Sequence, residues 1–255
     1  MVKKLALLAL LGLSAFASAS ESGTLSSRAQ RSFNAGKYVK GYGQLERALL
    51  ASRKEADLLS EGRVLIAMAQ IRTMNRDLDF ADSLLSVVHK EVLDKNTATS
   101  FAKAKIAIAN TREDYREAAK LCSAANADSV KKSDDNARGA FYAECAIANA
   151  GAHNNDKAQE YLKLTGKATD EDSGFYIYTA AQIADLNGQS EADSLYREAE
   201  TKSIQGNKPF ITATILYKRS QLKSTSAEEK DELKARCKNA FELMGLLNSA
   251  KRCSE

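Results

Sequence analysis

Ser129 and Lys132 have the serine-x-x-lysine spacing that lets a lysine activate a serine nucleophile in penicillin-recognising enzymes. The pair lies in a polar segment, in a chain crowded with serine and lysine. The Ser-Asp-Asn companion motif is missing, because Asp135 intervenes before Asn136. A motif of this kind indicates catalysis only in its proper structural context. We therefore interpret the pair as a chance match.

The two histidines also have ordinary structural interpretations. His89 lies near the end of an expected helix, where a cation complements the helix dipole, and His153 lies in a turn. Neither has a partner at metal-ligand spacing, and no phosphate-binding glycine loop or His-Glu helix signature is present. The sequence predicts no catalytic residue, no metal and no cofactor, and we expect no concave pocket with converging titratable groups.

The first 19 residues have the pattern of a signal peptide. Lys3 and Lys4 precede an apolar run, Leu5 to Phe16, and Ala17-Ser18-Ala19 provides a cleavage site. The run is too short to span a bilayer, which takes about 20 apolar residues. The sequence therefore predicts residues 1–19 as a signal peptide, and a mature chain that is soluble in the bacterial periplasm or secreted.

The charge balance argues against a nucleic-acid ligand. Removing the two leader lysines leaves 37 − 2 = 35 basic residues against 33 acidic ones, and the charges are interspersed. Nucleic-acid binding requires a concentrated basic face. The single proline, the abundant alanine and the scarcity of apolar-polar alternation predict an all-α fold.

A recurrent spacing places apolar residues along one helix face. Tyr115, Ala118, Cys122 and Ala125 follow one another at steps of three, four and three, and four other segments repeat these steps with a small residue in the second place. Such residues fall on one face of a helix, and the small residue permits close approach of a neighbouring helix. The small residues are Gly41, Ala81, Ala118, Ala158 and Ala192.

A second apolar position lies eleven or twelve residues before each small residue, and turn-forming residues separate the two. These upstream residues are Ala29, Ala69, Ile106, Ala146 and Ala181. Each unit is thus predicted to be a helix, a tight turn and a second helix. The small residues recur at intervals of 40, 37, 40 and 34, a periodicity that indicates stacked helix pairs forming a solenoid.

The segments "FNAGKYVKGYGQLERAL" and "LNGQSEADSLYREAE" resemble tetratricopeptide repeats. Gly36, Tyr38, Leu45 and Ala48 match the glycine, aromatic, bulky and alanine places of that motif, whereas Gly41 departs from its usual alanine. The resemblance implies a right-handed solenoid of about six helix pairs. Residues 20–207 are expected to form five pairs, and residues 208–255 a C-terminal capping pair.

The four cysteines are expected to pair, as is common in exported proteins. Cys122 lies in the second helix of the third unit and Cys145 in the first helix of the fourth, which stack in a solenoid. Cys237 and Cys253 both lie in the C-terminal pair. We predict the disulfides Cys122–Cys145 and Cys237–Cys253, with four buried thiols as the alternative.

The resemblance implies that the first helices form an inner face that binds a peptide or a partner helix. We therefore expect a non-catalytic protein–protein interaction scaffold. The alternatives are an accessory subunit of a cell-envelope or surface complex, binding through its edges or C-terminal cap, and an enzyme with an unrecognised site. The predicted partner-binding residues are Gln30, Asn34, Arg63, Gln70, Met74, Lys103, Asn110, Tyr178, Gln182 and Asp185.

Overall fold

The chain folds into helices, as predicted. The computed structural model describes residues 20–255, in which there are fourteen α-helices, one short 3-10 helix and no β-strand. The single proline, Pro209, stands at the first position of a helix, where its missing N–H breaks no hydrogen bond. The predicted signal peptide, residues 1–19, lies outside the described residues. Within the described chain, no helix is both long enough and apolar enough to cross a membrane.

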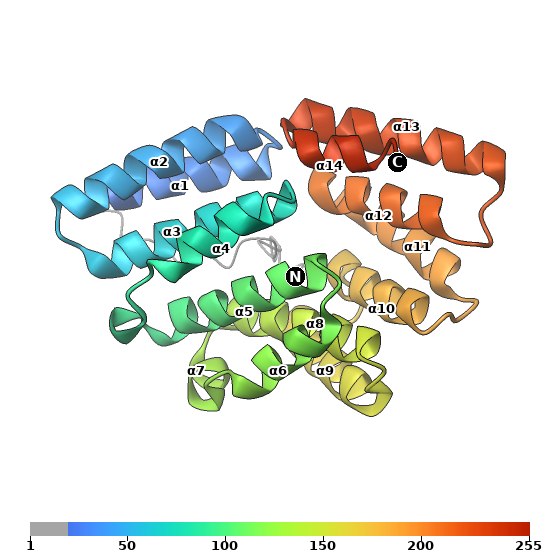
Figure 1. The fold of residues 1–255 in the computed structure, drawn as a ribbon, viewed down its shortest axis with the longest axis horizontal. Helices are drawn as coiled ribbons and strands as arrows, with labels where there is room; N and C mark the ends of the chain where they lie inside the picture. Colours follow the sequence, from blue (N-terminus) through green and yellow to red (C-terminus); the bar gives the residue numbers. More distant parts are fainter. Residues whose placement is uncertain (1–19) are drawn as a thin grey trace, which may run out of the picture.

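Most of the helices form consecutive pairs (Figure 1). The pairs are α1 with α2, α3 with α4, α5 with α6, α8 with α9, α10 with α11 and α12 with α13. The first four helices and the short 3-10 helix are α1 (Glu21–Asn34), α2 (Tyr38–Lys54), α3 (Leu58–Met74), α4 (Leu78–Ser86) and η1 (Lys90–Val92). The next five are α5 (Lys95–Thr111), α6 (Tyr115–Ala124), α7 (Ala127–Lys132), α8 (Asp135–Gly151) and α9 (Asn155–Thr169). The last five are α10 (Gly174–Leu186), α11 (Ala192–Gln205), α12 (Pro209–Gln221), α13 (Ala227–Met244) and α14 (Leu247–Arg252).

Seven of the turns between helices share one geometry. Two residues after each helix ends, the backbone adopts a positive φ, and the following N–H donates to the carbonyl five residues earlier. This is the Schellman motif, which satisfies the free carbonyls at a helix end. Glycine favours the positive φ but occupies it in only two of the seven turns. The seven residues are Gly36, Ala56, Arg76, Glu113, His153, Gly188 and Asn207.

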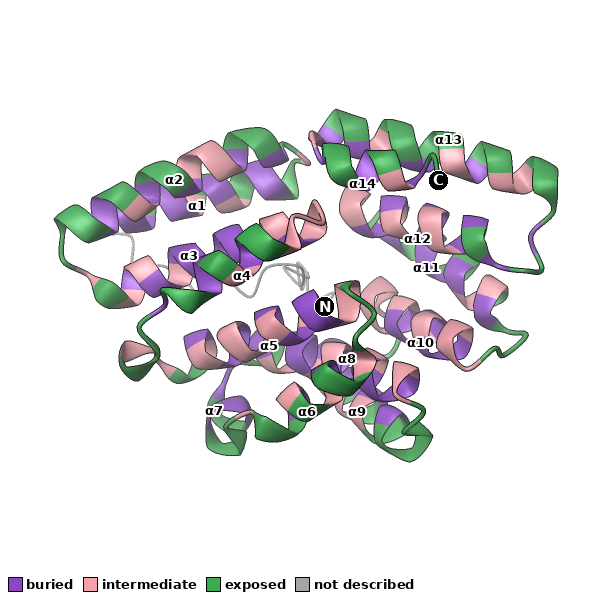
Figure 2. Ribbon diagram, in the orientation of Figure 1, coloured by how far each residue is buried: buried purple, intermediate pink, exposed green. Residues whose placement is uncertain are grey.

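The small residues of the repeat lie in the contacts between helices, as predicted. Ala81, Ala118 and Ala158 are fully buried, and Ala192 and Gly41 are also buried. The upstream residues Ala29, Ala69, Ile106, Ala146 and Ala181 are fully buried too. Figure 2 shows the buried residues along the contacting sides of the paired helices.

Gly41 departs from the repeat motif for a steric reason. The ring of Phe33, on α1, packs directly over Gly41 on α2, so that a Cβ at position 41 would overlap the ring. Phe33 in turn lies 5.6 Å from Tyr38 between ring centroids. The glycine therefore provides the space that an aromatic side chain of the paired helix fills.

Replacing Ala118 by leucine should lower the free energy of unfolding by about 1–3 kcal/mol, because the added methyl groups overpack a closed contact. Ala118 has no exposed surface. Ala124→Leu is the matched control, since Ala124 is exposed at the end of the same helix, and it should change stability by less than about 0.5 kcal/mol. Urea unfolding measures both, and equal stabilities for the two variants would contradict the predicted packing.

The C-terminal helices return to the N-terminal ones. One core cluster joins residues of α1–α5 to residues of α12–α14. Phe210 lies 6.4 Å from Tyr38 between ring centroids, and Ser249 Oγ donates to the carbonyl of Met74 at 2.6 Å. Arg252 pairs with Glu113 at 3.1 Å. Residues 208–255 therefore do more than cap the preceding pair, because they also join the two ends of the described chain (Figure 1).

Candidate functional site

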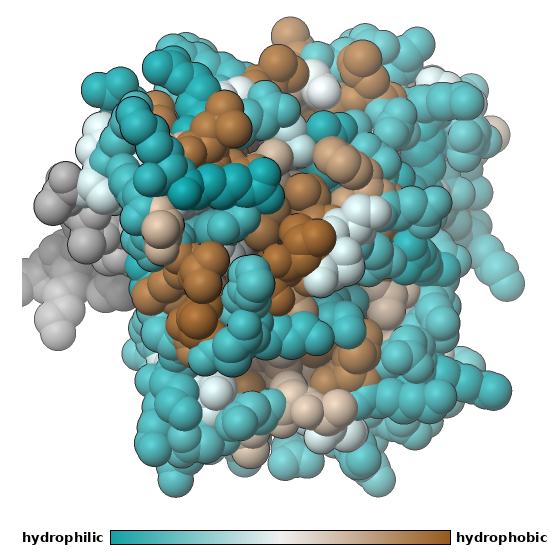
Figure 3. Space-filling view, turned by 60° about the vertical axis from the view of Figure 1, so that its left-hand side comes forward, coloured by the Kyte–Doolittle hydropathy of each residue, from teal (hydrophilic) through white to brown (hydrophobic). Residues whose placement is uncertain are grey.

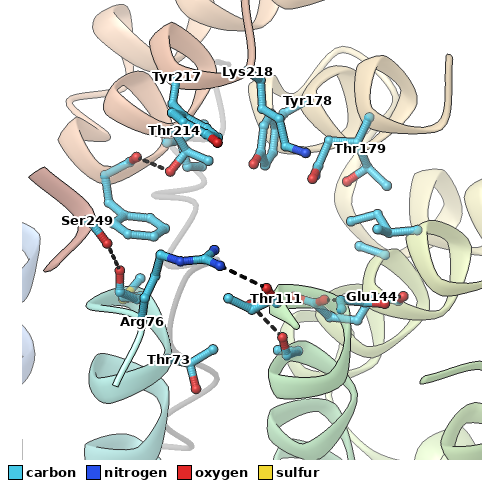
Figure 4. Close-up of a pocket in the computed structure, with 18 of the residues that line it drawn as sticks. Thr73, Arg76, Thr111, Glu144, Tyr178, Thr179, Thr214, Tyr217, Lys218 and Ser249 are labelled. Carbon is cyan, nitrogen blue, oxygen red and sulfur yellow. Dashed lines mark hydrogen bonds between the residues drawn. The ribbon is translucent and has the colours of Figure 1, made fainter. Parts of the chain in front are cut away.

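Six of the ten predicted partner-binding residues line one cavity, whose volume is about 230 Å³. Gln70 and Met74 come from α3, Lys103 and Asn110 from α5, and Tyr178 and Gln182 from α10. α8 adds Ala143, Glu144 and Ile147. We call this surface the inner face: the sides of α3, α5, α8, α10 and α12 that line the cavity. Figure 4 shows the cavity with residues of these helices converging on it.

The other four predicted residues do not line this cavity. Gln30 donates to Asn34 at 2.8 Å on α1. Arg63 pairs with Asp94 and donates to Thr97 at 3.2 Å, near the first turns of α3 and α5, whereas the cavity lies toward the ends of these helices.

Asp185 accepts a hydrogen bond from the hydroxyl of Tyr196 at 3.1 Å. Gly151, at the end of α8, is covered by the ring of Tyr115. The sequence pattern therefore identified α3, α5 and α10 correctly, although only part of each lines the cavity, whereas α1 does not line it.

Several cavity residues were not predicted, because they come from the turns and from the C-terminal helices. Arg76 and Glu113 occupy the positive-φ positions of two turns. The returning C-terminal segment supplies eight further residues of the lining. Those residues are Phe210, Ile211, Thr214, Tyr217 and Lys218 of α12, Phe241 of α13, and Ser249 and Arg252 of α14.

Lys103 and Glu144 are charged groups placed deep among the surrounding helices. Both side chains are partly exposed, and both line the cavity. Burial lowers the pKa of the Lys103 ammonium, although the nearby Glu144 opposes this shift. Burial also raises the pKa of Glu144, with Lys103 and the hydrogen bond from Asn110 opposing it. Asn110 Nδ2 donates to Glu144 Oε2 at 2.9 Å and to the Glu144 carbonyl at 3.0 Å.

Tyrosines make up another part of the lining. Burial raises the pKa of Tyr115 to about 12, and the carboxylates of Glu113 and Asp185 add to the shift. Burial likewise raises the pKa of Tyr178, whose ring lies 6.4 Å from that of Tyr196. These phenols are therefore neutral hydrogen-bonding groups near neutral pH.

The expectation that no concave pocket gathers titratable groups was wrong. Arg76, Lys103, Glu144, Tyr178 and Lys218 converge on one cavity. The sequence could not indicate this convergence, since the groups come from segments separated by up to 142 positions (218 − 76). Perturbed pKa values in a cavity are typical of functional sites, although they do not by themselves specify a reaction.

The serine-lysine pair and His89 lie outside the cavity. The ammonium of Lys132 pairs with Asp128 at 2.8 Å, and Ser129 is buried on the same short helix, α7. His89 Nδ1 lies 3.1 Å from Glu91 Oε1. Across residues 20–255, no group of three or more His, Cys, Asp or Glu side chains could hold a metal ion.

Both predicted disulfides are present. Cys122 of α6 is joined to Cys145 of α8, and their Cα atoms lie 5.7 Å apart. Cys237 of α13 is joined to Cys253, just after α14, with Cα atoms 5.9 Å apart. The first bond connects neighbouring helix pairs, and the second holds the C-terminal helix that contributes to the cavity.

Comparisons with known proteins do not identify a family. No protein-family model matches the chain, and no curated protein matches it.

Proposed function

We propose that the protein is a non-catalytic interaction scaffold that holds a segment of a partner protein on its inner face. The helix pairs would form a right-handed solenoid of the tetratricopeptide-repeat kind, with the inner face built from the first helix of successive pairs. The resemblance in sequence and the consecutive packing of the helix pairs support this architecture.

The observation that carries the proposal is the convergence of the predicted inner-face residues. Gln70, Lys103, Asn110, Tyr178 and Gln182 come from three helix pairs and share one cavity. Amide and tyrosine side chains can donate or accept hydrogen bonds, and a lysine ammonium donates them, so together they can bind a peptide backbone. Tyrosine is also enriched among residues that dominate binding energy.

The size of the cavity favours an extended segment as the bound part of the partner. A helix with its side chains is about 10–12 Å across. A cavity of about 230 Å³ is too small for such a cylinder but can admit a side chain of an extended peptide. Of the two ligands that the sequence suggested, the peptide therefore fits better than the partner helix.

We further propose that the protein works in the periplasm or outside the cell. The signal-peptide pattern of residues 1–19 supports export. The two disulfides support it independently, because such bonds persist in oxidising compartments.

Selection from a displayed library of random peptides tests the partner-binding role. We expect the wild-type protein to enrich peptides that Lys103→Glu binds at least tenfold more weakly. Lys105→Glu is the matched control, since Lys105 lies on the same helix but outside the cavity, and it should bind them within twofold of wild type. No enrichment, or equal binding by Lys103→Glu, would reject the role of the inner face.

The accessory-subunit alternative is favoured by one surface feature. Leu243, Leu247 and Val39 are 88%, 64% and 69% exposed. Val39 packs against Gly245 in the turn between α13 and α14, so these apolar side chains gather where the two ends of the described chain meet. Further exposed apolar residues are Leu50, Leu58, Phe80 and Val87 on the side formed by α2–α4. Figure 3 shows that on this side apolar patches alternate with hydrophilic side chains.

A double variant separates this alternative from inner-face binding. If the edge binds a partner, Leu243→Glu with Leu247→Glu should abolish capture of that partner and leave binding of the selected peptides unchanged. If the inner face binds, Lys103→Glu should have the reverse effect.

A further inference from the structure

The cavity contains more cations than the protein neutralises. Its lining has four cationic side chains, Arg76, Lys103, Lys218 and Arg252, and two carboxylates, Glu113 and Glu144, so the excess is 4 − 2 = 2 positive charges. Arg252 and Glu113 pair with each other at 3.1 Å. Three cations therefore share the one remaining carboxylate of the lining, Glu144, while Asp185 acts on Lys218 from outside the lining.

Lys218 is the clearest of these unpaired groups. Within residues 20–255 it has neither a hydrogen-bond partner nor an ion-pair partner, and Figure 4 shows it pointing into the cavity. Burial lowers the pKa of its ammonium; the carboxylates of Asp185 and Glu113 oppose this shift without contacting the ammonium, and the positive charges of Arg252 and Arg76 add to it. A deeply placed cation that no carboxylate contacts directly is unfavourable, so an anionic group bound beside Lys218 would be stabilised.

Arg76 approaches the cavity from the opposite side (Figure 4). Its guanidinium donates to the carbonyl of Thr111 at 3.3 Å, but no carboxylate pairs with it in the described chain. A guanidinium has five N–H donors, so most of its donors are still available for an anion.

Two hydrogen-bond acceptors of the lining are also unsatisfied. Gln70 Oε1 and Asn110 Oδ1 are buried atoms without a hydrogen-bond partner, and the whole Gln70 residue is only 5% exposed. Asn110 uses its amide N–H groups on Glu144. A rotation of either side chain would turn its acceptor toward a ligand that carries N–H donors, above all a cationic ammonium, and the carboxylate of Glu144 lines the same cavity.

The remaining lining is apolar. Met74 and Ile147 lie on α3 and α8, and Phe175, Phe210 and Phe241 contribute aromatic rings. Phe210 and Phe241 contact each other edge to face, at 5.9 Å between centroids. The volume of about 230 Å³ lies just below the range of about 300–1,000 Å³ typical of ligand pockets, which is the scale of one small organic molecule.

We propose that this cavity binds a free α-amino acid with a large apolar side chain. Its carboxylate would contact Lys218 and Arg76, its ammonium would donate to Gln70, Asn110 and Glu144, and its side chain would pack on the apolar lining. A simple fatty or aromatic acid leaves the two acceptors unsatisfied, and an inorganic anion leaves the apolar lining uncovered. The inference goes beyond the partner-binding role, because it assigns the same cavity a small-molecule occupant that would compete with the side chain of a bound peptide.

Isothermal titration calorimetry of the full mature chain tests the proposal with L-phenylalanine, L-leucine and L-methionine. At least one of the three should bind saturably. For L-phenylalanine, two analogues each remove one recognised group: L-phenylalaninamide lacks the carboxylate, and 3-phenylpropionate lacks the ammonium. Each analogue should bind at least tenfold more weakly than L-phenylalanine. If L-leucine or L-methionine binds best, the amide and the deaminated analogue of that amino acid replace them in the same comparison.

Variants locate the site. Lys218→Met should weaken binding of the amino acid at least tenfold but change binding of the amide less than twofold, whereas Lys218→Arg should retain binding. Circular dichroism and thermal unfolding confirm that each variant is folded, and Lys105→Met is the matched control outside the cavity.

Three results would overturn the proposal: no saturable binding of any of the three amino acids, an amide that binds as tightly as its parent, or full binding by a folded Lys218→Met variant. The peptide-selection experiment gives an independent answer. Loss of one binding activity therefore leaves the other interpretable.

Discussion

Replacing Arg219 by methionine should lower the free energy of unfolding by about 3 kcal/mol, since it removes the buried member of an ion network and leaves only the more exposed Arg197 and Arg236 to compensate its carboxylates. The Arg219 side chain is 5% exposed and bonds to three carboxylates. Its Nε, Nη1 and Nη2 atoms lie 3.1, 2.7 and 2.6 Å from oxygens of Asp193, Glu200 and Glu229. These contacts join α11, α12 and α13, so their loss should loosen the C-terminal helices together.

Arg236→Met is the matched control for this substitution. Arg236 also bonds to Glu200, at 2.8 Å, but its side chain is 45% exposed. Exposed ion pairs contribute about 0–1 kcal/mol, so we expect a correspondingly small change. Urea unfolding of both variants gives the comparison, and an Arg219→Met protein as stable as Arg236→Met would refute the assigned role.

The pH dependence of the Arg219 variant follows from Asp193. Burial raises the pKa of this carboxyl, but hydrogen bonds from Arg197 and Arg219 outweigh burial and place the pKa below the ordinary 3.8. A lowered folded-state pKa stabilises the protein fully above the unfolded-state value, and this stabilisation is lost as pH falls through the folded-state value. Arg219→Met should therefore lose less stability than wild type below pH 3.8.

Removing the Cys237–Cys253 disulfide should have the second large effect. Double substitution by serine should lower the free energy of unfolding by about 3 kcal/mol, from the chain entropy gained by the unfolded state. The bond holds the end of α14 to α13, and α14 supplies Ser249 and Arg252 to the cavity. We therefore also expect faster amide hydrogen exchange in α14.

The Cys122–Cys145 disulfide provides the control. It encloses a loop of similar length, with a sequence separation of 23 against 16, so its double serine variant should lose a similar amount of stability. It lies between α6 and α8, far along the chain from α14, whose exchange should stay unchanged. Equal α14 exchange in the two variants would show that the second disulfide does not fix this helix.

The sequence predicted the paired helices because their determinants are local. The spacing around Ala118 and Ala158 marked the buried side of a helix, and turn residues marked the helix ends. The disulfide partners followed from the same pattern, because Cys122 and Cys145 fall on helices of adjacent pairs. Short-range periodicity therefore carried most of the information about the helices and their order.

The closure of the chain could not be predicted in this way. The contact of Ser249 with Met74 joins residues 175 positions apart, and no periodic pattern specifies such a pairing. The sequence also did not predict the shared geometry of the seven turns. Residues such as Arg76 and Glu113 adopt a positive φ there, a conformation that usually indicates glycine.

The sequence therefore predicted only part of the candidate site. Lys103 and Tyr178 lie on helix faces that the repeat pattern identifies. Lys218 comes from a helix that matched the repeat poorly, and Arg76 comes from a turn. Both reach the cavity only because the C-terminal helices return to the N-terminal ones, which is a property of the whole fold rather than of any one segment.

The inner face encloses two lysines, Lys103 and Lys218, whose ammonium groups form no ion pair within the described chain and whose pKa values are lowered by burial. Reductive ¹³C-methylation followed by NMR titration measures this directly, with Lys103→Arg and Lys218→Arg assigning the two signals. Both groups should titrate below the ordinary 10.5, and saturating L-phenylalanine should raise the pKa of Lys218. Titration of both lysines at 10.5 or above, with no response to the amino acid, would contradict the account.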